Sequence, residues 1–496
     1  MTANRWSAST PVALAICLAT TSALTGADWN QWRGPHRDGV ARQSPPLLSA
    51  LPESGLMPVW VSEEKIRSAR DGGWGSPILA QGRVYVFAHT RQKAATRDLP
   101  KRKYPWLAPD KRGHLTAEQY KQYEVDRRDE DEKFSKAYQY REIVYCLDAR
   151  TGKTLWKNDE SSVYTRFVQS GTLVEHGGRL LLQGADRTVR CVDAESGRSL
   201  WRTRIPGEFR DQFYMSSFAV ADGVAVGLVG HLVGLDAESG KLLWQGDADT
   251  TKGTHASPIV WQPNGTELVI INVSGSETIC VEPRTGRERW RVRSEAGHST
   301  PVLAGTDRMI TFGSSRKRGL RCFRISPTSA EYLWTYHGAG DPGSSPVVVG
   351  GHVYVQGERN LACVNLETGQ EAWKTMLQHK DPRFTSLLAA DGKIFYGAEG
   401  MLCFAADPSG FRPVFEAKVN TEGLLASEKT HRHLLNLAEI ESQPEGFKKA
   451  EKLYRSRTEK YGPLKCTTPA FSDGRFYIRT RDGVACYDLR QPPIRP

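Results

Sequence analysis

The sequence lacks the signatures of several common enzyme classes. It has no HExxH pair, no GxSxG nucleophile turn and no Walker loop, so nothing in it points to a zinc protease, an α/β-hydrolase or a P-loop nucleotidase. None of its nine cysteines is adjacent to another, and none belongs to a CxxCH haem site. After residue 27, no apolar run approaches the twenty residues that span a bilayer. These absences favour a protein without catalytic or metal residues and without a transmembrane segment.

The first 27 residues have the pattern of a secretory signal peptide. Arg5 precedes an apolar stretch from Pro11 to Leu24, and small residues follow at the expected cleavage site, 25–27. Cys17 ends the motif "LAIC", but Ile16 occupies the place of the small residue that a lipid-attachment motif needs, so we do not expect lipidation. The sequence therefore predicts an exported, periplasmic protein that is soluble after cleavage.

The net charge of +11 comes from basic residues scattered among nearly as many acids. One concentration, residues 91–113, holds eight Lys or Arg against two Asp, which is typical of a solvated excursion or a docking surface. No aromatic-rich nucleic-acid module surrounds it. We expect a monomer with a protein or envelope-polymer partner and no nucleic acid.

An eleven-residue hairpin recurs along the chain. The clear copies are "CLDARTGKTLW" (146–156), "CVDAESGRSLW" (191–201), "GLDAESGKLLW" (234–244), "CVEPRTGRERW" (280–290) and "CVNLETGQEAW" (363–373), with degenerate copies at 322–334 and 403–415. Their terminal aromatic residues recur every 39 to 46 residues, the length of one four-stranded propeller blade. The sequence therefore predicts an all-β propeller.

Each repeated residue type has a structural role in this hairpin. The glycines supply the positive φ of the turn, and the aspartates of the first three copies accept hydrogen bonds from turn amides. The tryptophan, four residues after the glycine, packs between blades. Seven cysteines share one position on the third strand (146, 191, 280, 322, 363, 403, 486), and we expect them to be buried without forming disulfides.

A hydroxyl residue recurs before the first strand of each unit and sets the number of blades. The eight positions are Ser76, Thr172, Ser217, Ser257, Thr300, Ser345, Ser386 and Thr468. Eight copies predict eight blades over residues 56–490, followed by a tail at 491–496. We expect the hydroxyls to bond strand to strand around the channel.

The last copy, residues 479–490, ends without an outer strand. Residues 56–63, which contain Trp60, have the alternation of such a strand and are expected to complete this blade, because an unpaired edge would expose backbone groups. Residues 28–55 are then interpreted as a clasp that holds Trp29, Trp32 and Arg33 against the seam. The alternative is an arm exposed to a partner.

The mouth of the central channel is the candidate binding site. The residues just before the hydroxyls are expected to project there: Trp74, Gln169, Tyr214, His255, His298, Arg383 and Lys465. Such aromatic, amide, imidazole and cationic groups suit an anionic or sugar-like ligand. The alternative is that each is an ordinary loop residue. No metal site is predicted.

Two insertions interrupt the repeats. Residues 91–141 separate the second and third strands of blade one, and residues 417–462 separate blades seven and eight. Their composition predicts helices over 116–142 and 420–460, the latter as two helices. Since blades one and eight are neighbours, we expect the insertions to contact each other or to flank one opening, as a possible docking platform.

The repeats resemble the PQQ-binding-like β-propeller family, and "WNQWRGPHRDGV" resembles the start of exported members from planctomycete-type bacteria. The resemblance implies one of two classes: scaffolds similar to BamB, without a cofactor, or quinone-dependent dehydrogenases, which bind PQQ and calcium. Because the vicinal cysteines and haem site are absent, we favour a non-catalytic scaffold that binds a protein or an envelope component. The alternatives are a divergent PQQ-dependent dehydrogenase and a polysaccharide-binding module.

Overall fold

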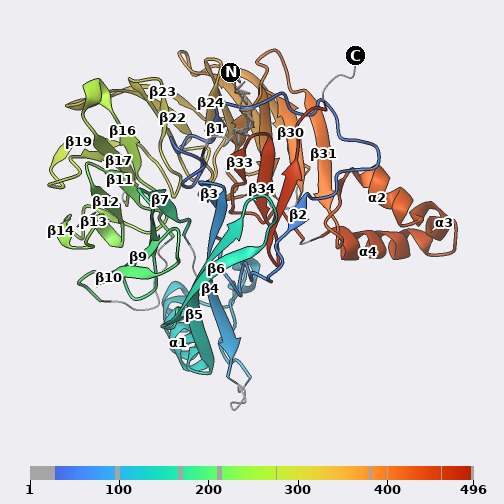
Figure 1. Ribbon diagram of the computed structural model, residues 1–496, viewed down its shortest axis with the longest axis horizontal. Helices are drawn as coiled ribbons and strands as arrows, with labels where there is room; N and C mark the ends of the chain where they lie inside the picture. Colours follow the sequence, from blue (N-terminus) through green and yellow to red (C-terminus); the bar gives the residue numbers. More distant parts are fainter. Residues whose placement is uncertain are drawn as a thin grey trace, which may run out of the picture.

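Each sequence repeat folds into a sheet of antiparallel strands, and eight such sheets form a ring (Figure 1). The computed structural model describes residues 28–94, 101–165, 171–208, 215–274, 276–378, 383–398, 400–459 and 461–492. The prediction of an eight-bladed β-propeller is confirmed. The signal-peptide prediction for residues 1–27 lies outside the described residues. In the described part of the chain, no helix has the length and apolar character needed to cross a bilayer.

The first four blades have the following strands. Blade 1 contains β3 (Ile78–Ala80), β4 (Arg83–Lys93), β5 (Tyr138–Asp148) and β6 (Thr154–Ser162). Blade 2 contains β7 (Val174–His176), β8 (Arg179–Gln183), β9 (Thr188–Asp193) and β10 (Ser199–Arg204). Blade 3 contains β11 (Ala219–Ala221), β12 (Val224–Leu228), β13 (Gly230–Asp236), β14 (Leu242–Gln245) and an added β15 (Lys252–Gly253). Blade 4 contains β16 (Ile259–Trp261), β17 (Leu268–Val273), β18 (Glu277–Val281) and β19 (Glu288–Arg293), with a 3-10 turn at Pro263–Gly265.

The second half of the ring follows the same plan. Blade 5 contains β20 (Val302–Ala304), β21 (Arg308–Phe312), β22 (Leu320–Ser326) and β23 (Ser329–Tyr336). Blade 6 contains β24 (Val347–Val349), β25 (His352–Gln356), β26 (Asn360–Asn365) and β27 (Glu371–Met376). Blade 7 contains β28 (Leu388–Ala390), β29 (Lys393–Gly397), β30 (Met401–Ala405) and β31 (Pro413–Val419), extended by β1 (Val40–Ala41) and β32 (Leu425–Ala426). Blade 8 contains β33 (Ala470–Ser472), β34 (Arg475–Arg479), β35 (Val484–Asp488) and β2 (Trp60–Val61).

The hairpin turns have the predicted chemistry. Gly152, Gly197 and Gly240 have φ of +73°, +75° and +73°. Asp148 and Asp193 accept hydrogen bonds from the backbone amides two and three residues ahead of them. The turn therefore combines a glycine conformation with a carboxylate that satisfies the turn amides.

The tryptophan of a fourth strand packs on the turn glycine of the next blade. A Cβ atom on Gly197 would lie 2.5 Å from the Trp156 ring, so this contact requires glycine. The same contact closes the ring, because a Cβ atom on Gly152 of blade 1 would lie 2.5 Å from the Trp60 ring, and Trp60 donates its indole N–H to Ala149 O at 3.0 Å. Neighbouring blades thus interlock in one direction around the ring.

The last blade takes its outer strand from the N-terminal part of the chain. β2 pairs antiparallel with β35, and Trp60 lies opposite Cys486. Cys146 lies opposite Trp156 in blade 1, so the segment from the other end of the chain occupies the same repeat position. The seven repeat cysteines are buried, as predicted. The largest buried apolar cluster joins blades 1, 7 and 8 at this seam and includes Trp29, Leu47 and Trp60.

The two insertions differ from the prediction in extent and placement. In the first, β4 and β5 continue as a long hairpin, a 3-10 turn covers Pro109–Lys111, and α1 spans Ala117–Ser135. Residues 138–142 are therefore strand rather than helix, because they pair with β4. In the second, α2 (Glu428–Leu434) and α3 (Leu437–Glu441) replace the predicted first helix, and α4 (Gly446–Thr458) is the second. Asn436, with φ of +50°, interrupts the first.

The described parts of the two insertions lie apart from each other. Figure 1 shows α1 beside the β4–β5 hairpin and α2–α4 on a separate side of the ring. The long hairpin carries α1 away from the seam, so of the two predicted arrangements, mutual contact or a shared opening, the described parts do not show the contact. Both insertions nevertheless leave the ring on the same face. The first insertion follows the second strand of blade 1, and the second insertion follows the fourth strand of blade 7. Second and fourth strands run in the same direction in an antiparallel blade, so they end at the same edge.

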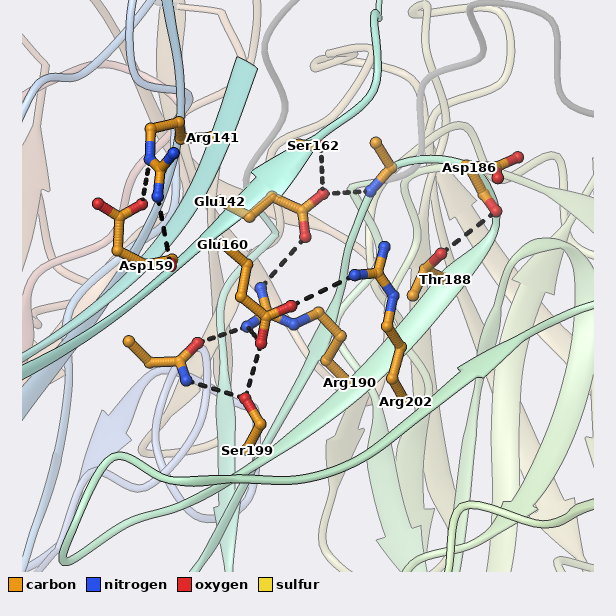
Figure 2. Close-up of polar contacts among 12 residues, drawn as sticks. Arg141, Glu142, Asp159, Glu160, Ser162, Asp186, Thr188, Arg190, Ser199 and Arg202 are labelled. Atoms are coloured by element: carbon orange, nitrogen blue, oxygen red, sulfur yellow. Dashed lines mark hydrogen bonds and ion pairs between the residues drawn. The ribbon is translucent and has the colours of Figure 1, made fainter. Parts of the chain in front are cut away.

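A buried ion-pair network joins blades 1 and 2 at the base of the first insertion (Figure 2). Glu142 accepts hydrogen bonds from Ala185 N at 2.6 Å and Ser162 Oγ at 2.9 Å, and lies 3.3 Å from Arg190 Nη1. The Arg190 Nη2 atom lies 2.6 Å from Glu160. Because Glu142 is 2% exposed and Arg190 is 1% exposed, Glu142 relies on the charge of Arg190, and Arg190 is paired with both Glu142 and Glu160.

The packing of tryptophan on glycine can be tested with two glycines that share φ. Gly240 and Gly223 both have φ of +73°, but a Cβ on Gly240 would lie 2.4 Å from Trp201, whereas nothing lies within 4 Å at Gly223. Gly223→Ala should lower the unfolding free energy by about 1 kcal/mol, the cost of the left-handed conformation. Gly240→Ala should cost about 3 kcal/mol because the ring must also move. Urea unfolding measures both, and equal losses would contradict the packing.

The buried network predicts a second difference in stability. Glu142→Gln should lower the unfolding free energy by about 3 kcal/mol, because Arg190 loses a buried partner. Asp159→Asn is the matched control, since Asp159 pairs at 2.6 Å with Arg141, which is 46% exposed. The control should cost less than about 1 kcal/mol. Urea unfolding of both variants measures the contrast, and a loss for Glu142→Gln no larger than for the control would contradict it.

Candidate functional site: an axial pocket

The eight hydroxyl residues form the inner girdle of the ring. Backbone N–H groups donate to the hydroxyl oxygen of the next blade in six links at 3.0–3.1 Å: Ser76 to Thr172, Ser217 to Ser257, Ser257 to Thr300, Thr300 to Ser345, Ser345 to Ser386, and Thr468 to Ser76. These links confirm the predicted bonding from strand to strand. They satisfy amides that have no neighbouring strand at the axis.

The segment after residue 27 begins at the seam. Trp29 N donates to Leu79 O at 2.9 Å, and Leu79 N donates back to Trp29 O at 3.0 Å. The Trp29 ring meets Phe471 of blade 8 edge to face, with centroids 6.4 Å apart. The predicted contact of Trp29 with the seam is therefore present. The chain then moves to blade 2, where Glu175 N donates to Asn30 O at 2.8 Å.

Beyond Asn30 the segment crosses the axis instead of following the seam. The Arg33 guanidinium, which is completely buried, donates to Pro346 O of blade 6 at 2.5 Å and to Leu387 O of blade 7 at 3.4 Å. The prediction that Arg33 and Trp32 lie against the seam is wrong. Arg33 lies beside blades 6 and 7 because residues at the start of their first strands offer carbonyl groups to its guanidinium there.

Arg37 has the same role on the other side of the axis. Its guanidinium donates to Pro258 O at 3.0 Å and to Phe218 O, and its Nε donates to Gln31 Oε1 at 2.7 Å. Arg37 is 1% exposed. Val40 then begins a parallel pairing with the first strand of blade 7. Residues 28–41 are thus an internal crosspiece, which we call the axial segment, and the alternative of an exposed arm is wrong.

A cavity of about 260 Å³ lies on the axis above this segment. It is lined by Trp32, Trp74, Gly171, Thr172, Met215, Ser217, His255, Ser257, His298, Gly343, Phe384, Ser386 and Cys466. Trp32 comes from the axial segment, and the others come from the blades. The next residues of the axial segment, including Pro35 and Arg37, line a different cavity on the opposite face of the ring. The turns that follow the first strands of several blades line that second cavity as well. The segment therefore closes the bottom of the cavity, which we call the axial pocket.

The axial pocket is rich in rings and holds no carboxylate among its described lining residues. The His255 and His298 rings lie with centroids 4.4 Å apart. Burial, together with the repulsion between the two imidazoles when both are protonated, lowers the pKa of His255 to about 4. Burial also lowers the pKa of His298. Both imidazoles are therefore neutral at pH 7, which allows them to lie close together.

A buried carboxylate shapes one side of the pocket. Asp341 is completely buried and accepts hydrogen bonds from the backbone N–H groups of Gly343 at 2.9 Å, Ser344 at 2.6 Å and Phe384 at 3.3 Å. Phe384 has φ of +65°, which a phenylalanine rarely adopts without such support. Burial raises the pKa of Asp341 despite these bonds. Asp341 thus positions Gly343 and Phe384, which both line the pocket.

The structure brings together three of the seven predicted mouth residues: Trp74, His255 and His298. Arg383 and Lys465 do not line the pocket, although their neighbours Phe384 and Cys466 do. Gln169 and Tyr214 lie outside the described residues. Sequence reasoning missed Trp32, Met215, Phe384 and Cys466. Three of these, Met215, Phe384 and Cys466, directly follow a predicted position. Alignment of the repeats on the hydroxyl residues could therefore have found them.

The histidine pair predicts a pH dependence of stability. Between about pH 6.5 and pH 4, an unfolded His255 binds a proton while the folded one does not, so the unfolding free energy should fall as pH falls through this window. His255→Gln should make this fall shallower, and His176→Gln, at an exposed position on β7, is the matched control. Urea unfolding at pH 4.5 and 7 measures the difference. An identical fall in wild type and His255→Gln would contradict the burial of a neutral imidazole.

Comparison with known proteins agrees with this architecture. Residues 140–375 match the family model described as outer membrane protein assembly factor BamB. No curated protein sequence matches the chain. Among solved structures, quinohemoprotein alcohol dehydrogenase ADHIIG from Pseudomonas putida HK5 has a TM-score of 0.54 and 14% identity, covering 95% of this chain and 82% of that one. The quinohemoprotein alcohol dehydrogenase from Comamonas testosteroni has a TM-score of 0.54 and 12% identity, covering 95% and 81%.

BamB from Moraxella catarrhalis is also similar, with a TM-score of 0.48 and 14% identity over 71% of this chain and 90% of that chain. Identities this low concern the fold. The recurring hairpins, the eight four-stranded blades and the match over residues 140–375 agree with one another. Over residues 140–375 the repeats of this chain are similar to those of the PQQ-like β-propeller family.

Proposed function

We propose that the protein is an exported, non-catalytic propeller that captures a protein partner at the face where the axial pocket opens. The observation that carries this proposal is the closed bottom of the pocket. Trp32 and the axial segment turn a channel into a blind cavity lined by Trp74, Phe384, Met215 and the two histidines. Such a cavity suits a ring-bearing group of a partner, because most of its lining is apolar and preformed.

The chemistry of the lining supports binding over redox catalysis. A quinone cofactor with calcium would need oxygen ligands, carboxylates above all. The described lining offers hydroxyls and no carboxylate, and the oxygens of Thr172, Ser257 and Ser386 already accept hydrogen bonds from the girdle. No group of three or more potential metal ligands occurs among the described residues. The described residues therefore do not fit the calcium and quinone pair.

The two insertions support a protein partner. They leave the ring on the face where the pocket opens, as the strand order requires. Each exposes a large apolar side chain, Trp106 at 63% in the first and Phe447 at 68% in the second. Exposed apolar groups beside a rigid scaffold are typical of interaction surfaces. A partner anchored in the pocket would have both insertions within reach on the same face.

A photocrosslinking experiment tests the proposal. A photoreactive phenylalanine analogue replaces Trp74 in the pocket or, as a matched control, Tyr332, which is 51% exposed on the outer strand of blade 5. In an envelope extract, the Trp74 position should give one discrete protein adduct, which excess wild-type protein abolishes and excess Trp74→Ala does not. No adduct, or the same adduct from position 332, would contradict the proposal.

Two further readouts separate the alternatives. An adduct that resists proteinase and is removed by glycosidases would support the polysaccharide-binding alternative. The dehydrogenase alternative predicts that protein incubated with PQQ and calcium reduces an electron-accepting dye when an alcohol or a sugar is added. Saturable, alcohol-dependent dye reduction would overturn the non-catalytic assignment.

A further inference from the structure

The two insertions carry the two most exposed large apolar side chains in the described part of the chain. Phe447, near the start of α4, is 68% exposed, and Trp106, between β4 and α1, is 63% exposed. The Arg112 guanidinium carbon lies 5.9 Å from the Trp106 ring centroid, so a cation accompanies this ring. Apolar surface of this size is stabilised when it leaves water, which makes both rings suited to contact with an apolar layer.

Both rings lie in strongly basic segments. Residues 101–114, around Trp106, contain five Lys or Arg and one acid. Residues 446–457, around Phe447, also contain five Lys or Arg and one acid. Because the two segments come from different insertions, the same combination of an exposed ring and excess positive charge occurs twice in the molecule.

The lysines of these segments are not neutralised inside the protein. In the described part of the chain, six of them form no ion pair: Lys101, Lys103, Lys111, Lys448, Lys449 and Lys452. Arg102, by contrast, pairs with Asp131 of α1. Arg455 lies 2.6 Å from Glu451, the acid of its segment. The charge left for an external partner is therefore mainly that of the lysines.

The acids of α1 that contact the first basic segment are already bound. Glu130 accepts backbone N–H bonds from Lys103 at 2.7 Å and from Tyr104 at 3.0 Å. Asp131 pairs with Arg127 at 3.2 Å as well as with the segment. These contacts fix the segment on α1, while Lys103 itself is exposed. An anionic surface outside the protein can therefore reach its ammonium group.

The two basic segments belong to the same face of a rigid ring. Both insertions leave the ring there, as the strand order requires, and the axial pocket opens on that face too. In Figure 1, α1 and α2–α4 lie on separate sides of the ring, so the insertions are spaced apart. A broad anionic surface with an apolar layer just below it can engage both segments together. A bilayer that contains anionic lipids has this structure.

We infer that the two insertions bind a bilayer that contains anionic lipids, with Trp106 and Phe447 among the headgroups and the six lysines against the phosphates. Aromatic rings favour this interfacial depth, and lysines near an anionic leaflet add an attraction that salt screens. The inference goes beyond the proposed function, because it concerns the insertions and not the pocket. A partner captured by the pocket would then be met at the membrane surface.

Sedimentation with vesicles tests the inference. The chain from residue 28 onward is used, because the apolar stretch from Pro11 to Leu24 would itself enter a bilayer. Vesicles of equal parts phosphatidylcholine and phosphatidylglycerol should bind the protein with an apparent Kd about tenfold lower than vesicles of phosphatidylcholine alone. Raising the salt concentration from about 50 to about 500 mM should remove most of this difference.

The charge contribution has a matched pair of variants. Lys111→Gln combined with Lys448→Gln, one change in each insertion, should weaken binding to the anionic vesicles by about fivefold or more. Lys153→Gln combined with Lys241→Gln is the control, because these lysines lie in turns between third and fourth strands, at the opposite face of the ring. The control should change the binding by less than about twofold, since its charges lie far from the lipid.

The rings have a matched pair of their own. Trp106→Ala combined with Phe447→Ala should weaken binding to the anionic vesicles by about tenfold, because the rings no longer leave water. Met376→Ala, at a position 61% exposed on the outer strand of blade 6, should leave the binding unchanged. All of these positions are exposed, and circular dichroism checks that each variant is folded.

No binding to the anionic vesicles, or equal binding to both kinds, would overturn the inference. Charge or ring variants that behave like their controls would also overturn it. A photoreactive phenylalanine at position 106 that gives a protein adduct in an envelope extract, without vesicle binding, would assign the insertions to an acidic protein surface instead. Because the crosslink from position 74 reports on the pocket alone, the proposed function and this inference can fail independently.

Discussion

Eight short strands converge on one axis, and in the described part of the chain only β28 has a strand of its own sheet, β1, on that side. Burying backbone N–H and C=O groups without partners is costly, so the ring depends on how they are satisfied. Serine and threonine hydroxyls accept from the N–H groups in a girdle from blade to blade. Arg33 and Arg37 donate to carbonyl groups from opposite sides of the ring. The polar centre of this apolar fold follows from that requirement.

The same constraint operates at the outer seam in a different way. Blade 8 has three strands from the end of the chain, and β2 supplies the fourth from the other end. Trp60 then takes the position that a tryptophan occupies in other blades, against the turn glycine of its neighbour. Because one segment, residues 28–61, provides both the axial contacts and the seam strand, closure of the ring and closure of the pocket are coupled.

The sequence predicts the structural features that recur in several blades, but it does not predict the features that occur only once. Gly152, Trp156 and Cys146 each have counterparts in other blades, so their roles could be inferred from spacing and checked against several copies. The path of the axial segment has no counterpart, and its arginines carry no pattern that distinguishes an axial position from a seam. The break at Asn436 likewise depends on local packing of one insertion. The prediction placed Arg383 at the channel mouth, one residue before Phe384, which lines the pocket. The spacing of the repeats does not reveal the positive φ of Phe384.

The path of the axial segment also bears on how the chain reaches its native state. Arg33 contacts Leu387, 354 residues later in the sequence, and Trp60 pairs with Cys486. Contacts of such long sequence separation form late, because much of the chain must be ordered before they can be made. The blades can form from local hairpins as they are synthesised. The segment made before them lacks some of its partners until the last blade exists, so the earliest part of the propeller to be translated is the last to be fixed completely in place.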